Sequence, residues 1–231
     1  MKTIGMIGGM SWESSLEYYR IINEAVKQSL GGLHSAECIL HSLDFARIEQ
    51  LQHGGDWKAL EEILVDSARK LQAAGAGIIL ICTNTMHLLA DAVESAVSAR
   101  LLHIADAAGE AIAARGMRRI GLLGTQFTMQ RGYYSNRLSD RYGVEVIVPV
   151  PEDQEVVHRT IYEELCLGVM KGRSREAMNR IIRRLGERGV EGVILGCTEL
   201  PLLVREAESG IPLFDTTDLH ARAAAAIALS G

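Results

Sequence analysis

The feature that most constrains this chain is a short motif that occurs twice, about half the chain apart. The later copy, Val190–Pro201, is an apolar run that ends in Gly-Cys-Thr-Glu and is followed by a helical pattern. The earlier copy, Gly75–Met86, has a matching apolar run that ends in Cys-Thr-Asn-Thr. Aligning the two polar ends places Thr83 on Cys197, so the copies are 114 residues apart. A short, β-branched apolar run of this kind predicts a buried parallel strand.

A second pair of similar segments has almost the same spacing. Thr3–Met10 resembles Arg119–Thr125, and the matching residues Gly5 and Gly121 are 116 positions apart. Two pairs of segments that share nearly one offset indicate a diverged internal duplication. We therefore expect two similar lobes of about 110 residues each, which is an ordinary domain size.

Strand and helix patterns alternate along both halves, which favours parallel βαβ units. The predicted fold class is α/β, with two pseudo-symmetric lobes that are each a parallel sheet flanked by helices, and with the active site in the interlobe cleft. The first lobe is expected to span residues 1–104 and the second 105–211. The alanine-rich C-terminal segment, residues 212–231, either completes the first lobe or stays on its own lobe.

Composition excludes several classes of protein. The 231 residues carry a net charge of −5 and include no run of basic residues, which argues against a nucleic-acid partner. No apolar run approaches the length of a membrane span, and the N-terminus lacks a signal-peptide pattern, so we expect a cytoplasmic protein without a membrane partner. The four cysteines and seven histidines lack metal-ligand spacing, so no metal is expected.

Cys197 is the leading candidate for a functional residue because it follows directly on a predicted strand. Open α/β sheets place their chemistry at the carboxyl ends of strands. We expect the N-terminus of the next helix to favour the thiolate form of Cys197. The alternative is a small, buried apolar side chain, which is what many isolated cysteines are.

The glycine-rich turns allow two interpretations. Gly8 and Gly9 either bring backbone N–H groups close to a ligand or form a tight turn without a ligand. Thr125 either binds a carboxylate or caps a helix. Neither turn has the full dinucleotide fingerprint, so a nucleotide-binding protein is the weakest alternative.

Four motifs, taken together and in order, resemble the aspartate/glutamate racemase superfamily and its aspartate racemase branch in particular. They are Ile4–Met10, Cys82–Met86, Leu122–Thr125 and Gly196–Glu199. The resemblance implies two opposed cysteines that exchange the α-proton of an amino acid. It also implies that the enzyme uses neither pyridoxal phosphate nor a metal, and that it is a homodimer.

The resemblance also implies roles for individual residues. Cys197 matches the catalytic cysteine of the second lobe. Arg47 is the candidate partner for a distal carboxylate of the substrate. The other implied substrate contacts are Met10, Gln52, Asn84, Thr85, Thr125, Thr198 and Glu199.

The chain departs from the family pattern at two positions. Thr83 stands where the family usually has the cysteine of the first lobe, and Cys82 lies one residue early. Because side chains alternate along a strand, Cys82 should point away from the side that Thr83 faces and should be packed. Cys166 stands where the resemblance implies a basic residue of the second lobe, so Arg47 is compatible with an acidic substrate but the sequence alone does not fix one.

The expected function is racemisation of aspartate- or glutamate-like amino acids by proton transfer between Cys197 and Thr83. The resemblance implies that the cysteine of the second lobe, here Cys197, deprotonates the L enantiomer. Because a hydroxyl is far less acidic than a thiol, Thr83 is a poor resting base, and L is the expected preferred substrate. The alternatives within the superfamily are hydantoin racemisation, maleate isomerisation and decarboxylation. Outside it, the chain is an amino-acid-binding protein without turnover.

Overall fold

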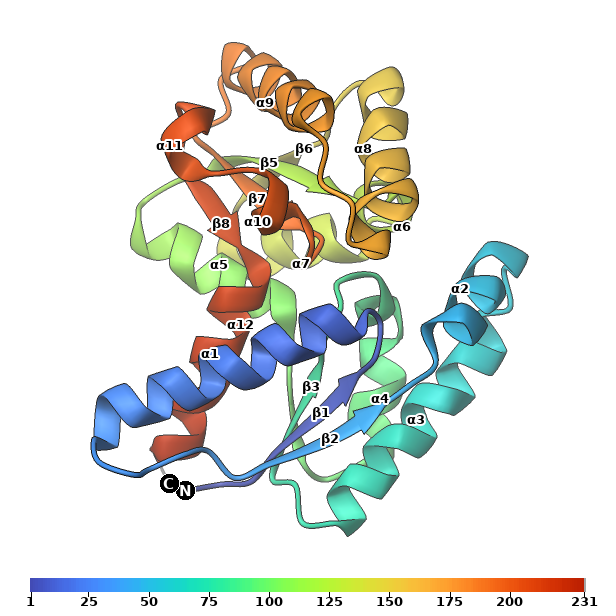
Figure 1. The fold of residues 1–231 in the computed structure, drawn as a ribbon, viewed down its shortest axis with the longest axis vertical. Helices are drawn as coiled ribbons and strands as arrows, with labels where there is room; N and C mark the ends of the chain where they lie inside the picture. The colour runs from blue at the N-terminus through green and yellow to red at the C-terminus, as the bar shows by residue number, and fades with distance from the viewer. Residues whose placement is uncertain (231) are drawn as a thin grey trace. The chain divides into compact units, whose positions relative to one another are not determined.

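The computed structural model describes residues 1–230, which form two α/β units (Figure 1). The first unit comprises Met1–Ile104 and the described residues from His220 onward. The second comprises Ala105–Leu219. Each unit contains a four-stranded parallel sheet with helices on both faces, which confirms the predicted α/β class of two similar lobes.

Both sheets have the same strand order. The first sheet has the order β2-β1-β3-β4, and the second has the order β6-β5-β7-β8. The strands are β1 (Ile4–Gly8), β2 (Cys38–Ser42), β3 (Ile78–Ile81), β4 (Arg100–Leu102), β5 (Arg119–Gly124), β6 (Glu145–Ile147), β7 (Gly192–Gly196) and β8 (Leu213–Asp215). The duplicated motifs form the central strands, β1 and β3 in one unit and β5 and β7 in the other.

The helices follow the strands in alternation. The first unit contains α1 (Trp12–Leu30), α2 (Phe45–Gly54), α3 (Trp57–Ala73), the 3₁₀ helix η1 (Thr85–Leu89) and α4 (Ala90–Ala96). The second contains α6 (Gln126–Gln130), α7 (Tyr133–Tyr142), α8 (Pro151–Glu163), η2 (Leu165–Leu167), α9 (Gly172–Glu187), α10 (Leu200–Leu203) and α11 (Glu206–Ser209). Two helices cross the division between the units, α5 (Ile104–Ala114) and α12 (Thr216–Leu229). None of the helices in the described residues is long and apolar enough to cross a membrane.

The two faces of the first sheet are covered by different helices. Ile79 and Ile81 of β3 pack on one face with residues of α2, α3 and α4. Leu80 and Cys82 pack on the opposite face with residues of α1 and α12. This alternation is the two-residue period of a strand. It places Cys82 in a fully buried core, as the sequence predicts.

The second sheet is covered in the same way, with α8 and α9 on one face and α5 and α7 on the other (Figure 1). Val193 and Leu195 of β7 pack against apolar residues of α8 and α9. Cys197, two residues after Leu195, belongs to the same buried cluster. The strand therefore delivers the thiol to the α8 and α9 side of its sheet.

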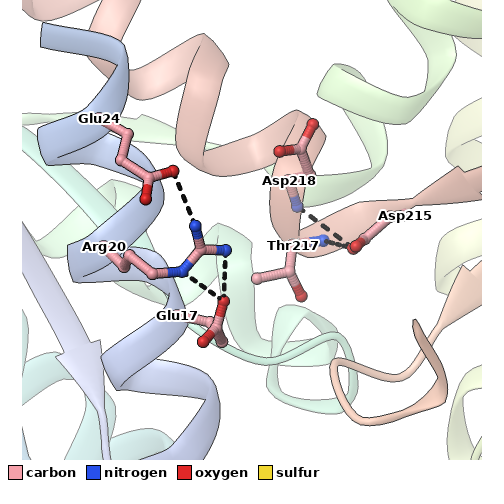
Figure 2. Close-up of polar contacts among 6 residues, drawn as sticks. All are labelled: Glu17, Arg20, Glu24, Asp215, Thr217 and Asp218. Carbon is pink, nitrogen blue, oxygen red and sulfur yellow. Dashed lines mark hydrogen bonds and ion pairs between the residues drawn. The ribbon is translucent and has the colours of Figure 1, made fainter. Parts of the chain in front are cut away.

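The return of the chain to the first unit occurs at His220, whereas the sequence analysis placed it near residue 212. The segment up to Leu219 stays with the second unit because β8 is hydrogen-bonded to β7. Asp215 at the end of β8 begins α12 by accepting hydrogen bonds from the backbone N–H groups of Thr217 and Asp218, at 2.8 and 3.2 Å (Figure 2).

Charged pairs stabilise the exposed side of α1. The guanidinium group of Arg20 donates to Glu17, three residues earlier, and to Glu24, four residues later (Figure 2). Pairs with these spacings lie on one helix face. All three side chains are about half exposed, so each pair contributes only a few tenths of a kcal/mol.

Candidate active site

A hydrogen-bonded carboxylate lies at the carboxyl end of β7. The Cys197 thiol donates to Oε2 of Glu199 at 3.0 Å, and the Thr198 hydroxyl donates to the same oxygen at 2.9 Å. Glu199 is 4% exposed and Cys197 is 8% exposed. An oxygen that accepts two donors in a buried place is strongly held. The strand exit therefore presents a thiol with a proton acceptor already in contact with it.

The expectation that a helix terminus favours the Cys197 thiolate is wrong. Only the four-residue helix α10 follows, and it starts three residues after the thiol. Burial raises the pKa of Cys197 well above its ordinary value, and the nearby charge of Glu199 raises it further. Cys197 therefore rests as a thiol, and forming the thiolate requires a local group to take its proton.

The corresponding exit of β3 presents hydroxyl and amide groups. Thr83 is partly exposed, whereas Asn84 and Thr85 are buried. Cys82, one residue earlier, is fully buried, and burial raises the pKa of its thiol far above the ordinary value. Among these neighbours, Thr83 is the accessible proton donor, and Cys82 is part of the core.

Two further predicted residues gather beside this exit. The side-chain amide of Gln52 on α2 donates to the sulfur of Met86 in η1 at 3.1 Å. Met10 belongs to the same buried cluster as Met86. Arg47 lies on the exposed side of α2 and forms no ion pair among those seen in residues 1–230. The structure thus places Gln52 against Met86, puts Met10 in the same buried cluster as Met86, and leaves Arg47 on the surface.

Thr125 follows β5 in the second unit. Gly124 of β5 is in register with Gly196 of β7, so Thr125 and Cys197 leave neighbouring strands at the same level. The Thr125 hydroxyl accepts from the backbone N–H of Thr128 at 3.3 Å and thereby caps α6. Thr125 therefore acts as a helix cap, and its side chain is buried at the strand exit.

The glycine turn after β1 is a tight packing feature. Gly9 has φ of +82°, which favours glycine, and its N–H donates to the Ser15 hydroxyl at 2.8 Å. A side chain on Gly9 would also collide with the backbone oxygen of Leu43. This geometry supports the tight-turn interpretation, because the N–H group that a ligand would need already has a partner.

Within residues 1–230, no group of three or more His, Cys, Asp or Glu side chains has the arrangement of a metal site.

Comparison with known proteins identifies the family. The model of the Asp/Glu/Hydantoin racemase family matches residues 7–224, which is nearly the whole chain and includes both strand exits. The chain belongs to this family. The expectation of an amino-acid racemase, which is an isomerase, is thereby confirmed at the level of the enzyme class.

Two solved structures and one further sequence relative are similar to this racemase over most or nearly all of its length. A proposed Asp/Glu racemase from Yersinia pestis is 53% identical, with a TM-score of 0.93 over 99% of this chain and 100% of the other. An aspartate racemase homologue from Pyrococcus horikoshii OT3 is 37% identical, with a TM-score of 0.85 over the same shares. A broad-specificity amino-acid racemase from Bacillus subtilis is 22% identical over 169 residues, covering 70% of this chain and 69% of its own.

Two contacts at the strand exits of this racemase were not predicted from its sequence. One is the hydrogen bond from Cys197 to Glu199, a residue that was expected only to bind substrate. The sequence signal for this bond was the two-residue spacing of Cys197 and Glu199, because residues i and i+2 can share one turn after a strand. The other is His87, whose ring lies 2.8 Å from the carbonyl oxygen of Thr83. Its signal was a histidine four residues after the predicted catalytic position.

Proposed function

We propose that the protein is a cofactor-independent racemase of aspartate- or glutamate-like amino acids, in which Cys197 and Thr83 exchange the α-proton on opposite faces of the substrate. The observation that carries this proposal is the buried contact of the Cys197 thiol with the Glu199 carboxylate at 3.0 Å. Membership of the racemase family supports the reaction class. The aspartate racemase homologue among its relatives supports the substrate class.

The reaction from the L enantiomer begins with activation of the thiol. Glu199 takes the proton of Cys197, and the resulting thiolate removes the α-proton of the amino acid. The bond electrons stay on the substrate as a carbanion-like state. The Thr83 hydroxyl then delivers a proton to the opposite face, directly or through water, and water restores the hydroxyl proton. The D amino acid results, and Glu199 then gives its proton to the hydroxide that the water left, so every group regains its starting protonation.

Glu199 is suited to this role because of where it lies. A general base must be within hydrogen-bond reach of the proton that it takes, and such a base contributes about 10²–10⁴-fold to rate. The raised pKa of Cys197 makes this help necessary for deprotonation, and it keeps the thiol protonated so that a proton is in place for delivery in the reverse direction. One dyad therefore serves both directions on the Cys197 side.

The two proton-transfer groups are unequal. A thiol has an ordinary pKa of about 8.5, whereas an aliphatic hydroxyl is a far weaker acid. Thr83 therefore rests protonated, so it can pass on a proton, directly or through water, far more easily than it can act as a resting base. We propose that exchange of the α-proton is faster from the L enantiomer than from the D enantiomer.

Substrate recognition is proposed for residues around the same exits. Asn84, Thr85, Thr125 and Thr198 would hold the α-carboxylate and amine, with Met10 and Gln52 beside them. Arg47 would approach the distal carboxylate, since Cys166 is uncharged at the position where the family pattern has a basic residue. We also propose a cytoplasmic homodimer, on the basis of the resemblance to aspartate racemases.

Solvent exchange at Cα tests the function directly. The protein is incubated in D₂O with the L and D forms of aspartate, glutamate and alanine, with hydantoins and with maleate, and loss of the Cα proton is followed by NMR. We expect deuteration of aspartate or glutamate without added cofactor and in the presence of a chelator. Turnover confined to hydantoins or maleate would replace the proposed substrate class. Binding of amino acids without exchange would show a protein that lacks turnover.

A further inference from the structure

The ring of His87 joins the exits of two neighbouring strands in the first unit. His87 lies in η1 and is 2% exposed. Its Nδ1 is 2.8 Å from the carbonyl oxygen of Thr83, which follows β3. Its Nε2 is 3.1 Å from the backbone nitrogen of Ile104, which follows β4. The ring is therefore a bridge between the peptide of Thr83 and the start of α5.

These two partners fix the protonation of the ring. The backbone N–H of Ile104 can only donate, so Nε2 of His87 must be the acceptor. The carbonyl of Thr83 can only accept, so Nδ1 must carry the proton. His87 is thus held as a neutral imidazole with one defined tautomer.

The local helix geometry explains why a side chain is needed here. In an α-helix the carbonyl of Thr83 would receive the backbone N–H of His87, four residues later. Because η1 is a 3₁₀ helix, the backbone N–H of His87 donates instead to the carbonyl oxygen of Asn84, at 3.1 Å. The imidazole supplies the donor that the Thr83 carbonyl lacks. The same ring satisfies one of the N–H groups left unpaired at the start of α5.

Further buried rings support this bridge. The ring of His103 lies 4.5 Å from that of His87, and the ring of His220 lies 5.7 Å from it. His220 is itself held by two groups: the Tyr18 hydroxyl at its Nδ1 and the Leu102 carbonyl at its Nε2, both at 2.8 Å. The His87 ring is therefore packed beside other buried rings, one of which is itself held by two hydrogen bonds.

The second unit uses a different device at the equivalent place. Position 201, which is 114 residues after His87, is a proline and carries no such ring. Instead, the hydroxyl of Thr216 donates to the carbonyl of Leu195 at 2.9 Å and joins the exits of β8 and β7. The histidine bridge is thus specific to the strand exit that carries Thr83.

From these contacts we propose that His87 is a positioning residue for Thr83. The bond to the Thr83 carbonyl fixes the peptide plane after Thr83, and with it the direction of the side chain that leaves the same Cα. His87 itself moves no proton in the reaction. This inference rests on the proposed function, because the hydroxyl of Thr83 is what it positions.

Two substitutions separate the two bonds of the ring. The side-chain amide nitrogen of asparagine lies close to the place of Nδ1, so His87→Asn keeps a donor for Thr83 and loses the acceptor for Ile104. Glutamine reaches the place of Nε2, so His87→Gln keeps an acceptor for Ile104 and loses the donor for Thr83. Tyr18→Phe, which loosens His220 without changing either bond, is the control for the surrounding packing.

The experiment follows L-aspartate in D₂O and measures two quantities, the exchange of its Cα proton and the amount of D-aspartate formed. Their ratio reports proton delivery on the Thr83 side. We expect His87→Gln to lower this ratio about tenfold, or about 1.4 kcal/mol, while exchange from L stays within about twofold. His87→Asn and Tyr18→Phe should keep the ratio within about twofold of the wild type.

The outcomes distinguish the inference from the proposed function. If wild-type protein exchanges neither enantiomer, the proposed function itself fails, and this is seen before any variant is measured. If wild-type protein racemises L-aspartate but His87→Gln lowers exchange and D formation in equal proportion, or lowers neither, His87 has only a structural role. Nitrogen-15 NMR of labelled histidine adds a readout independent of activity: protonation of His87 at Nε2 would overturn the bridge.

Discussion

Replacing Glu199 with glutamine separates two opposite effects of this residue on Cys197. The glutamine keeps the size of the side chain and an oxygen for the thiol, but it cannot take up the thiol proton. It also removes a negative charge that raises the pKa of Cys197. Burial, which is the largest cause of the raised pKa, remains. The variant thiol should therefore stay protonated at neutral pH, and the group that takes up its proton is lost.

The size of the effect follows from these two terms. A general base in contact contributes about 10²–10⁴-fold. Removal of the charge offsets part of that loss by lowering the thiol pKa, so we expect the lower end of the range. Glu199→Gln should reduce Cα exchange from L-aspartate by about 100-fold at pH 7, which is about 2.7 kcal/mol of barrier.

The assay is the initial rate of Cα deuteration of L-aspartate, followed by NMR between pH 7 and pH 10. Raising the pH should recover part of the lost rate in the variant, because hydroxide then ionises the thiol in place of Glu199. Glu206→Gln removes an exposed carboxylate of the same unit and is the matched control. If the Glu199→Gln protein exchanges at the wild-type rate or faster at pH 7, Glu199 acts only by disfavouring ionisation of Cys197. It is then not the general base for the thiol.

Two further predictions concern buried groups. Cys82→Ala should keep exchange within about twofold and lower the free energy of unfolding by about 1 kcal/mol, measured with urea, because the thiol is core; lost exchange in a folded variant would make Cys82 catalytic. Burial raises the pKa of Tyr134 in the folded protein above the ordinary phenol value of about 10. The contribution of the protonated phenol to the free energy of unfolding is therefore complete below pH 10 and is lost as the pH rises further. The free energy of unfolding of Tyr134→Phe should therefore exceed that of wild type at pH 10.5, and the difference should be larger at pH 10.5 than at pH 8. An equal difference at both pH values would count against ionisation of Tyr134.

Much of the fold could be predicted because the apolar pattern is regular. The central strands β3 and β7 are continuous apolar runs, and α3 and α9 have long amphipathic faces. By contrast, α2 was not predicted. Only Ile48 and Gln52 of its ten residues are buried, so its apolar stripe is too sparse to stand out.

The candidate site could be predicted only in part, because its chemistry depends on contacts beyond the local pattern. The duplicated motif placed Thr83 and Cys197 at strand ends. The ionisation state of Cys197 depends on how deeply the thiol is buried and on the direction of the Glu199 side chain, which no periodicity encodes. The contact of His87 with Ile104 joins residues 17 apart, a separation that no local pattern encodes.

The most direct test of the account compares Cα exchange from each enantiomer of aspartate separately, in D₂O, for wild type, Cys197→Ser, Thr83→Cys and the control Cys38→Ser. We predict that wild type exchanges the L proton at least about tenfold faster than the D proton, and that Cys197→Ser loses most L exchange while folded. Thr83→Cys should raise D exchange about tenfold, and Cys38→Ser should match wild type. Equal exchange of both enantiomers by wild type, or wild-type exchange by a folded Cys197→Ser protein, would contradict proton transfer through Cys197 as the single strong base.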